Sequence, residues 1–303
     1  MNAVTVLMYH AIVDGEAIGA DAHYSVAPAT FAHQLHLIQT RGRRVCSVSQ
    51  LLNEACSIAH RQPPVCLTFD DGHLSNAGAA EIIARCGGQA EFFVNPAMVG
   101  QPGFLDWSAL RDMAAMGMSI QSHGMHHRYL DQLSPPEVEA ELAQSKAAIE
   151  DAIGKPVQVY APAGGRMPAG FMSLARRLGY AAVCTSRVGL WSWPADHAYT
   201  PGQATAAATS PSSNPRARAV QDGAAAAAIQ SSSALDIPRL AMLHSTSDAR
   251  FLAWITQHPL EMLKQQTRYR VLRLSKQILG NGGHERLRRL LLGHDKTASS
   301  QPD

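Results

Sequence analysis

Two adjacent carboxylates, Asp70 and Asp71, follow a short apolar run and precede Gly72. Neighbouring side chains of a strand point to opposite faces, so the two carboxylates can share a site only where the backbone bends, and a glycine permits that bend. Like charges this close resist being ionised together unless a cation lies between them. The pair therefore indicates a metal site at a strand end. A simpler interpretation, an aspartate that caps a helix over residues 76–86, also fits.

A second polar cluster, Ser122-His123-Gly124-Met125-His126-His127, also follows an apolar run, at residues 118–121. Two imidazoles and one carboxylate are a common ligand set for a catalytic divalent metal, because they leave coordination positions for water and substrate. One histidine alone would mean little. Three histidines within five residues, together with an aspartate pair at another strand end, favour one shared metal centre.

Apolar runs of strand length alternate with segments of helical periodicity. We expect strands over residues 4–9, 45–48, 65–69, 90–94, 118–121, 157–160, 181–185 and 237–244, and helices over 28–42, 76–86, 108–116, 135–153 and 171–178. This alternation predicts an α/β fold, a distorted (β/α) barrel of about seven parallel strands with a C-terminal helical tail. Both polar clusters then lie at the C-terminal ends of strands, where such barrels place their chemistry.

Composition sets few limits on function. The chain has 303 residues, of which 46% are hydrophobic, enough for a substantial core, and its formal net charge of +2 gives no reason to expect nucleic acid as a partner. Five cysteines without a metal-type C-x-x-C spacing favour buried, reduced thiols. The N-terminal segment lacks the basic region and the apolar core of a signal peptide, so we expect a cytoplasmic protein.

Two segments depart from the barrel pattern. Within a barrel domain expected over residues 1–262, residues 203–234 are poor in large apolar side chains and cannot offset their ordering entropy, so we expect a disordered insertion there. Residues 263–293 have the pattern of a basic amphipathic helical tail, and 294–303 are expected to be disordered. Such a tail binds anionic membranes or simply packs on the barrel, and both interpretations stay open.

With these residues in view, the chain resembles the polysaccharide deacetylases of carbohydrate esterase family 4. The resemblance is carried by Thr-Phe-Asp-Asp-Gly at 68–72 and by the histidine cluster at 122–127. The segments 7–10, 104–107, 130–133 and 145–146 are similar to the sequence around these motifs in the family. The motifs stand in order and at fitting spacing over roughly residues 4–190, which makes a chance match improbable.

The resemblance assigns roles to individual residues. It implies that Asp71, His123 and His127 bind the metal, Zn²⁺ or another divalent ion such as Co²⁺, and that Asp70 is the general base. The chemistry of these residues agrees, since a metal polarises an acetamide carbonyl and lowers the pKa of water, and a carboxylate accepts the proton from that water. His126 is interpreted as a neighbour of the ligands.

The third motif departs from the family pattern. It reads Tyr160-Ala161-Pro162-Ala163-Gly164-Gly165-Arg166, so Ala161 stands where the family has an arginine that steadies the base. That ion pair is then missing or comes from elsewhere, and Arg166 is one candidate. Pro162, Gly164, Gly165 and Arg166 are expected to contact substrate, because the glycines let backbone N–H groups approach a developing oxyanion. An arginine-free motif is similar to a subgroup associated with exopolysaccharide biosynthesis.

The catalytic acid is less well defined. The fourth motif of the family is not recognisable, and the fifth, a Leu-x-His on a late strand that supplies the acid, has its match in Met242-Leu243-His244. His244 is therefore the candidate, although a histidine at a strand end can also be structural. His10 ends the first strand on the same expected rim and is the alternative acid or a substrate contact.

The predicted function is a metal-dependent hydrolase that removes N-acetyl groups from an amino sugar, in a polysaccharide or in a lipid-linked precursor. The basic tail would suit peripheral contact with the inner membrane and a lipid-linked substrate. Two alternatives stay open. One is a carbohydrate-binding relative that has lost turnover through its altered third motif, and the other is a deacylase that acts on a different amide.

Overall fold

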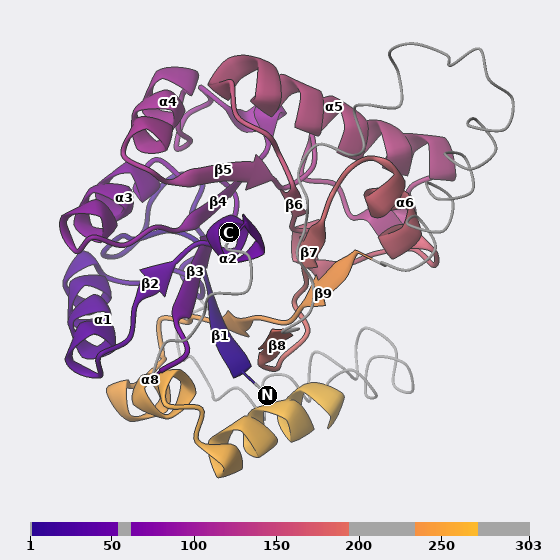
Figure 1. Cartoon of the computed structure of the whole chain (residues 1–303). Coiled ribbons are helices and arrows are strands. Elements are labelled where there is room, and N and C mark those ends of the chain that lie inside the picture. Colours follow the sequence, from indigo (N-terminus) through magenta and orange to yellow (C-terminus); the bar gives the residue numbers. More distant parts are fainter. Residues whose placement is uncertain (1, 54–61, 194–233, 272–303) are drawn as a thin grey trace, which may run out of the picture.

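The computed structural model describes residues 2–53, 62–193 and 234–271. In this part of the chain the strands form a ring and helices cover its outside (Figure 1). The strand order is β10-β1-β3-β4-β5-β6-β7-β9, and every pairing along this path is parallel. The strands of the path are β1 (Asn2–Tyr9), β3 (Val65–Phe69), β4 (Glu91–Val94), β5 (Ser119–Ser122), β6 (Val159–Tyr160), β7 (Ala182–Cys184), β9 (Leu235–Ile237) and β10 (Leu240–Ala241). The predicted distorted (β/α) barrel is confirmed in a nearly closed form.

The last predicted strand closes this ring in two pieces. We expected one strand over 237–244, but Pro238, which has no N–H group for the ladder, separates β9 from β10. In β9, Ile237 pairs with Cys184 of β7, and in β10, Leu240 pairs with Leu7 of β1. A single short stretch therefore bridges the two edges of the sheet.

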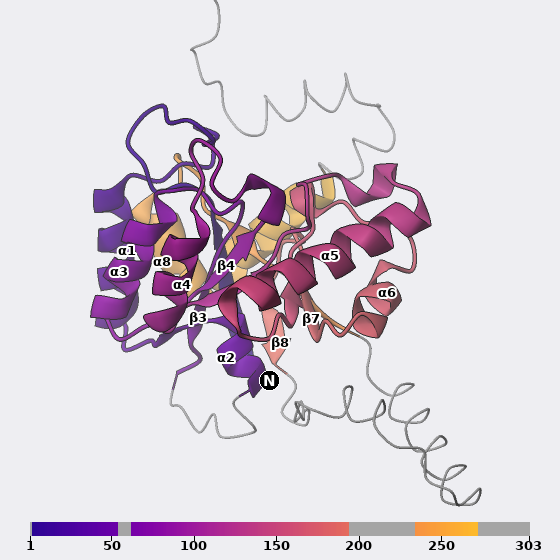
Figure 2. The same ribbon diagram turned by 90° about the horizontal axis from the view of Figure 1, so that it is seen from above.

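The helices on the outside agree closely with the sequence prediction. They are α1 (Pro28–Thr40), α3 (Asn76–Arg85), α4 (Trp107–Ala115), α5 (Pro135–Ile153) and α6 (Phe171–Arg177). The helix α5 has a capping box formed by Ser134 and Glu137, and it ends at Gly154 with a left-handed φ of 71°. Figure 2 shows α5 and α6 together on one side of the barrel and α1, α3 and α4 on the other.

Side-chain alternation along the strands gives the barrel two cores. One face of each strand packs against the helices, with Phe31, Leu110 and Ile149 in the same outer cluster. The other face points into the ring, where Val6, Phe93 and other residues form an inner cluster. This division follows from the two-residue period of a strand.

One end of the barrel is closed by the short helix α2 (Val48–Asn53), which lies over the centre of the ring in Figure 1. Its apolar side chains belong to the inner cluster. The buried carboxylate of Glu91, at the start of β4, accepts hydrogen bonds from the backbone N–H of Ser49 (2.8 Å) and from the hydroxyl of Ser119 (2.7 Å). The N-terminal ends of the strands are therefore covered, and the opposite ends remain for a site.

Three short elements differ from the sequence prediction. β2 is limited to Val45–Cys46, because α2 begins at Val48. β8 (Trp191–Trp193), antiparallel to β1, was not predicted, since three residues carry no readable period. A helix over residues 259–271 begins before the predicted start of the tail at 263.

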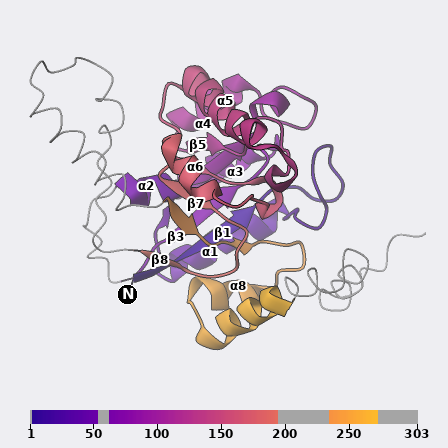
Figure 3. The ribbon, with the colours of Figure 1, turned by 90° about the vertical axis from the view of Figure 1, so that its right-hand side faces the viewer.

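The helix α8 (Asp248–Ile255) and the helix over 259–271 lie together on the side of the barrel opposite α5 (Figure 3). The predicted insertion at 203–234 lies outside the described residues, except for Ala234. The tail beyond Val271 and the predicted disordered end at 294–303 also lie outside them. Among the described helices, none combines the length and the apolar character needed to cross a membrane.

Candidate metal centre and active site

The two polar clusters meet at the C-terminal rim of the barrel. Asp70 and Asp71 directly follow β3, and His123 directly follows β5. The backbone bends one residue earlier than expected, since Asp71 itself has a positive φ of 73° before Gly72 at 71°. His127 has a positive φ of 56°. Residues other than glycine rarely adopt this conformation, and where they do the surrounding structure must hold them in it.

Asp71, His123 and His127 bring one ligand atom each to within 4.8 Å of one another. The Oδ1 atom of Asp71 lies 3.2 Å from Nε2 of His123 and 3.2 Å from Nε2 of His127. Two ligand atoms that are each about 2 Å from a tetrahedral ion lie roughly 3.3 Å apart. The same Oδ1 atom is buried and has no hydrogen-bond partner among the described residues. These observations fit a divalent cation between the three side chains.

The orientation of His123 is fixed by a backbone carbonyl. Its Nδ1 atom lies 2.7 Å from the oxygen of Ala161. A carbonyl can only accept, so Nδ1 carries the proton and Nε2 keeps its lone pair for a metal. Burial alone would raise the pKa of Asp71, but the two imidazoles beside it hold this pKa well below its usual range. The carboxylate is therefore ionised and ready to bind a cation.

His126 is turned away from the ligands. Its Nδ1 atom lies 2.7 Å from Oε1 of Glu141, whose other oxygen accepts the backbone N–H groups of Met125 (2.8 Å) and His126 (3.0 Å). The interpretation of His126 as a neighbour agrees with this contact. Glu141, from α5, thus holds the histidine loop, and the sequence analysis missed it. Its position on the buried stripe of α5, three residues after Val138, was the available signal.

The expected base, Asp70, forms a buried ion pair with Arg239. The two carboxylate oxygens of Asp70 accept hydrogen bonds from Nη1 (2.6 Å) and Nη2 (2.8 Å) of the guanidinium group. Burial alone would raise the pKa of Asp70, but the charge and hydrogen bonds of Arg239, together with the nearby His123 and His10, outweigh burial and lower this pKa. The ion pair that Ala161 cannot make is therefore made from the break between β9 and β10.

The suggestion that Arg166 reaches back to the base is wrong. Its Nε atom donates to Asp131 at 2.9 Å, and its guanidinium lies over the ring of Tyr129, 4.6 Å from the centroid. Both partners belong to the segment that follows the histidine loop, so Arg166 joins the third motif to that segment instead of to the base.

The glycines of the third motif serve close packing. They lie in the 3-10 turn η3 (Ala163–Gly165), where the N–H of Gly165 donates to the oxygen of Pro162 at 2.9 Å and is not free for an oxyanion. A Cβ atom on Gly164 would lie 2.9 Å from the ring of Tyr129, and one on Gly165 would lie 2.6 Å from Ser186. Both glycines also have positive φ angles, 58° and 66°. The turn therefore uses the N–H of Gly165, and the expected contacts of Pro162, Gly164, Gly165 and Arg166 with substrate stay predictions.

The two histidines considered as the acid lie at the same rim, because β1 and β10 run parallel. His10 follows β1 next to Asp70, whose N–H donates to the oxygen of Tyr9 at 3.0 Å. Burial lowers the pKa of His10, against the effect of the two aspartates, and its Nδ1 atom is buried without a hydrogen-bond partner among the described residues. The side chain of His244 is exposed, and its backbone N–H donates to the oxygen of His23 at 3.0 Å.

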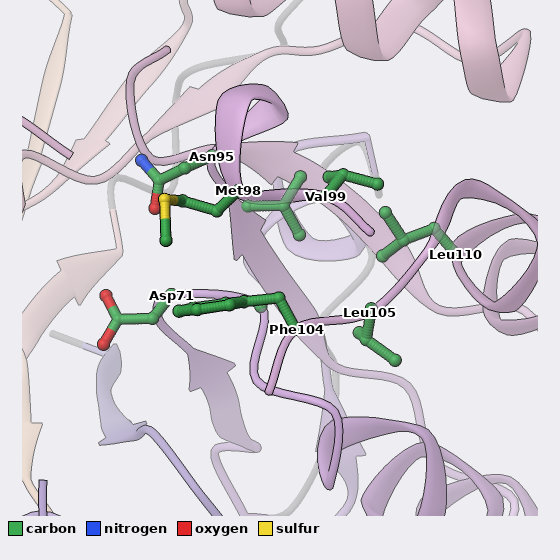
Figure 4. A pocket seen from close by; sticks show the side chains of 9 residues that line it. Asp71, Asn95, Met98, Val99, Phe104, Leu105 and Leu110 are labelled. Carbon is green, nitrogen blue, oxygen red and sulfur yellow. The ribbon is translucent and has the colours of Figure 1, made fainter. Parts of the chain in front are cut away.

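A recess lies behind the carboxylate of Asp71 (Figure 4). Its wall is mostly apolar and consists of Gly72, Val94, Asn95, Met98, Val99, Phe104, Leu105 and Leu110. Asn95 is the polar exception, and its amide donates to the oxygens of His123 (2.8 Å) and Gly124 (3.0 Å). The recess therefore gives the metal centre a low-dielectric wall, which strengthens electrostatic interactions, and Asn95 holds the histidine loop from this side.

We expect the replacement of His127 by Gln to lower zinc affinity by more than about 100-fold, because a direct ligand is lost. The matched control is His126→Gln, which removes a neighbouring imidazole that faces Glu141 and should cost about 10-fold or less. Titration of both variants with zinc against a competing chelator measures the difference. An equal loss in the two variants would contradict the assignment of the ligands.

Comparison with known proteins agrees with this geometry. Residues 58–183 match the family model described as polysaccharide deacetylase. YxkH of Bacillus subtilis strain 168, named as a candidate polysaccharide deacetylase, is 25% identical over 185 residues. That match covers 61% of this chain and 64% of YxkH, which is less than two thirds of the length of that relative.

Two solved structures share the fold. The deacetylase PplD of Streptococcus pyogenes, solved in complex with acetate, has a TM-score of 0.64 and 21% identity, over 84% of this chain and 98% of PplD. The polysaccharide deacetylase BC0361 of Bacillus cereus has a TM-score of 0.63 and 22% identity, over 84% of this chain and 69% of the other. The match of residues 58–183 and the shared barrel make this chain similar to the polysaccharide deacetylases in sequence and in fold.

Proposed function

We propose that this protein is a metal-dependent hydrolase that removes N-acetyl groups from an amino sugar. The observation that carries the proposal is the meeting of Asp71, His123 and His127 at one point, with a separate ionised carboxylate, Asp70, adjacent in sequence. Three protein ligands leave coordination positions open, which is typical of a catalytic metal and not of a structural one. The match of residues 58–183 to the polysaccharide deacetylase family model supports the same reaction.

The residues around the centre suit the hydrolysis of an amide. A divalent ion such as Zn²⁺ held by the three ligands supplies polarisation of the amide carbonyl and a lowered pKa for water. Asp70 takes the proton from the attacking water as the new C–O bond forms. The C–N bond then breaks, an acid gives a proton to the amine nitrogen, and acetate and the free amine leave.

We assign the proton donor to His244 and a substrate contact to His10. Burial lowers the pKa of His10 and favours its neutral form, and a neutral imidazole with an unpartnered nitrogen suits hydrogen bonding to a sugar. The side chain of His244 is exposed at the same rim, on the side open to substrate. The matching Leu-x-His position in the family supports this division of roles.

We expect the purified protein to release acetate from an N-acetylglucosamine oligomer, to lose this activity on chelation and to regain it with zinc. Asp70→Asn should bind zinc normally and lower kcat by about 10² to 10⁴-fold, because only the base is lost. Asp112→Asn, on the exposed face of α4, is the matched control. Acetate and free amine are measured together. Sugar binding without acetate release would indicate a non-catalytic relative, and release of formate from a formyl sugar alone would indicate another amide.

Steady-state kinetics distinguishes the proposed roles of His10 and His244. We expect His244→Gln to lower kcat by about 10² to 10⁴-fold with little change in KM, because a proton donor acts on the chemical step. His10→Gln should act mainly on KM. If the pattern is reversed, the acid is His10 and the assignment made here is incorrect.

We also propose a cytoplasmic location with peripheral contact at the inner membrane, which suits a lipid-linked precursor as substrate. The support comes from the helix over 259–271, where Leu260 and Leu263 are 64% and 59% exposed. Lys264, next in sequence to Leu263, is also exposed, and its Nζ atom lies 3.9 Å from Glu261. An exposed apolar face with adjacent cations is typical of helices that bind anionic membranes.

Co-sedimentation with vesicles that contain anionic phospholipid checks this contact. We expect full-length protein to bind, and the double variant Leu260→Asp, Leu263→Asp to bind at least several-fold more weakly, because charges replace the apolar face. The control is Met116→Asp, a similar change at an exposed methionine after α4. Equal partitioning of the three proteins would remove the membrane role.

A further inference from the structure

We propose that Arg239 is the positioning residue of the catalytic base. The inference rests on the proposed function, since it concerns the base of that reaction. Its basis is geometric: a planar guanidinium and a planar carboxylate meet through two short hydrogen bonds inside the barrel.

Arg239 is held as firmly as Asp70. Its side chain is fully buried, its Nε atom donates to the oxygen of Thr185 at 3.2 Å, and its Nη1 atom also contacts the hydroxyl of Thr68 at 3.2 Å. The hydroxyl of Thr68 in turn donates to the oxygen of Leu7 at 2.9 Å. The guanidinium therefore has partners on two sides of the ring, and its plane sets the plane of the Asp70 carboxylate.

This arrangement leaves Asp70 one orientation. A base must lie within hydrogen-bond reach of the proton that it takes, and a shift of about 1 Å can cost roughly 100-fold in rate. Without Arg239 the carboxylate would be buried beside a second carboxylate with no cation of its own. Lysine would keep the charge but not the two-pronged contact. The planar geometry of the guanidinium therefore matters as well as its positive charge.

The position of Arg239 in the chain connects the base to the closure of the barrel. Arg239 stands between β9 and β10, and its backbone N–H donates to the oxygen of Arg187 at 2.9 Å. The stretch that bridges β7 to β1 therefore also orients the base. If the stretch between β9 and β10 were displaced, Asp70 would lose its contact with Arg239, although both aspartates would remain at the end of β3.

The guanidinium of Arg239 also has an aromatic neighbour inside the barrel. It lies over the ring of Phe93, a residue of the inner cluster, 5.6 Å from the ring centroid. This contact adds a third side on which the orientation of Arg239 is held.

The test compares Arg239→Lys and Arg239→Ala with the wild-type zinc enzyme. We expect kcat to fall by roughly 100-fold in Arg239→Ala and by less in Arg239→Lys, with zinc affinity and KM within about 3-fold of wild type. A purely structural role would change zinc affinity and KM together with kcat.

The control is Arg187→Ala, a neighbouring arginine that pairs with Asp236 at 2.9 Å and is half exposed. It should keep the wild-type kcat. If Arg239→Ala does not fold, as judged by circular dichroism and thermal unfolding, Arg239→Lys decides. A wild-type kcat in a folded, zinc-loaded Arg239→Lys would overturn the inference. A wild-type enzyme that releases no acetate would instead overturn the proposed function.

Discussion

Two neighbouring carboxylates at the end of one buried strand are the constraint on which the rest of the site depends. Asp70 is buried and Asp71 is partly buried, and neighbouring like charges in such surroundings need positively charged partners. In the structure, each of the two carboxylates has its own set of partners. Asp70 pairs with the guanidinium of Arg239, and the Oδ1 atom of Asp71 lies 3.2 Å from an Nε2 atom of each of two imidazoles, a spacing that fits ligands of one ion. In the proposed function, one carboxylate therefore accepts a proton and the other binds a metal.

This division requires rigid supports, and they come from several elements. The carbonyl of Ala161, directly after β6, orients His123. Glu141 of α5 holds the backbone of the histidine loop, and Asn95, directly after β4, supports the same loop. Asp71 and His127 adopt left-handed backbone conformations that cost energy. Such strain persists only where the surroundings determine the conformation, and here the supports are hydrogen bonds to buried groups.

The third motif lacks an arginine at position 161, and the ion pair with Asp70 is made by Arg239 instead. In the family the motif is expected to supply an arginine to the base, but here Ala161 supplies a carbonyl to His123, and its glycines let the turn pack against Tyr129 and Ser186. Arg166 joins this turn to Asp131. The electrostatic partner of the base comes instead from the stretch that closes the barrel, so closure of the fold and orientation of the base depend on the same few residues.

Much of the fold could be predicted from the sequence because its signals are local. The period of apolar residues, the capping box at Ser134 and the glycine at 154 determined α5, and the run before Asp70 determined β3. The two metal-ligand motifs were also visible, since each is contiguous and lies at a strand end. What only the tertiary structure decided is which distant side chains become partners. No local pattern pairs Arg239 with Asp70, 169 residues apart, or turns Arg166 toward Asp131, because these contacts depend on how the ring of strands closes in space.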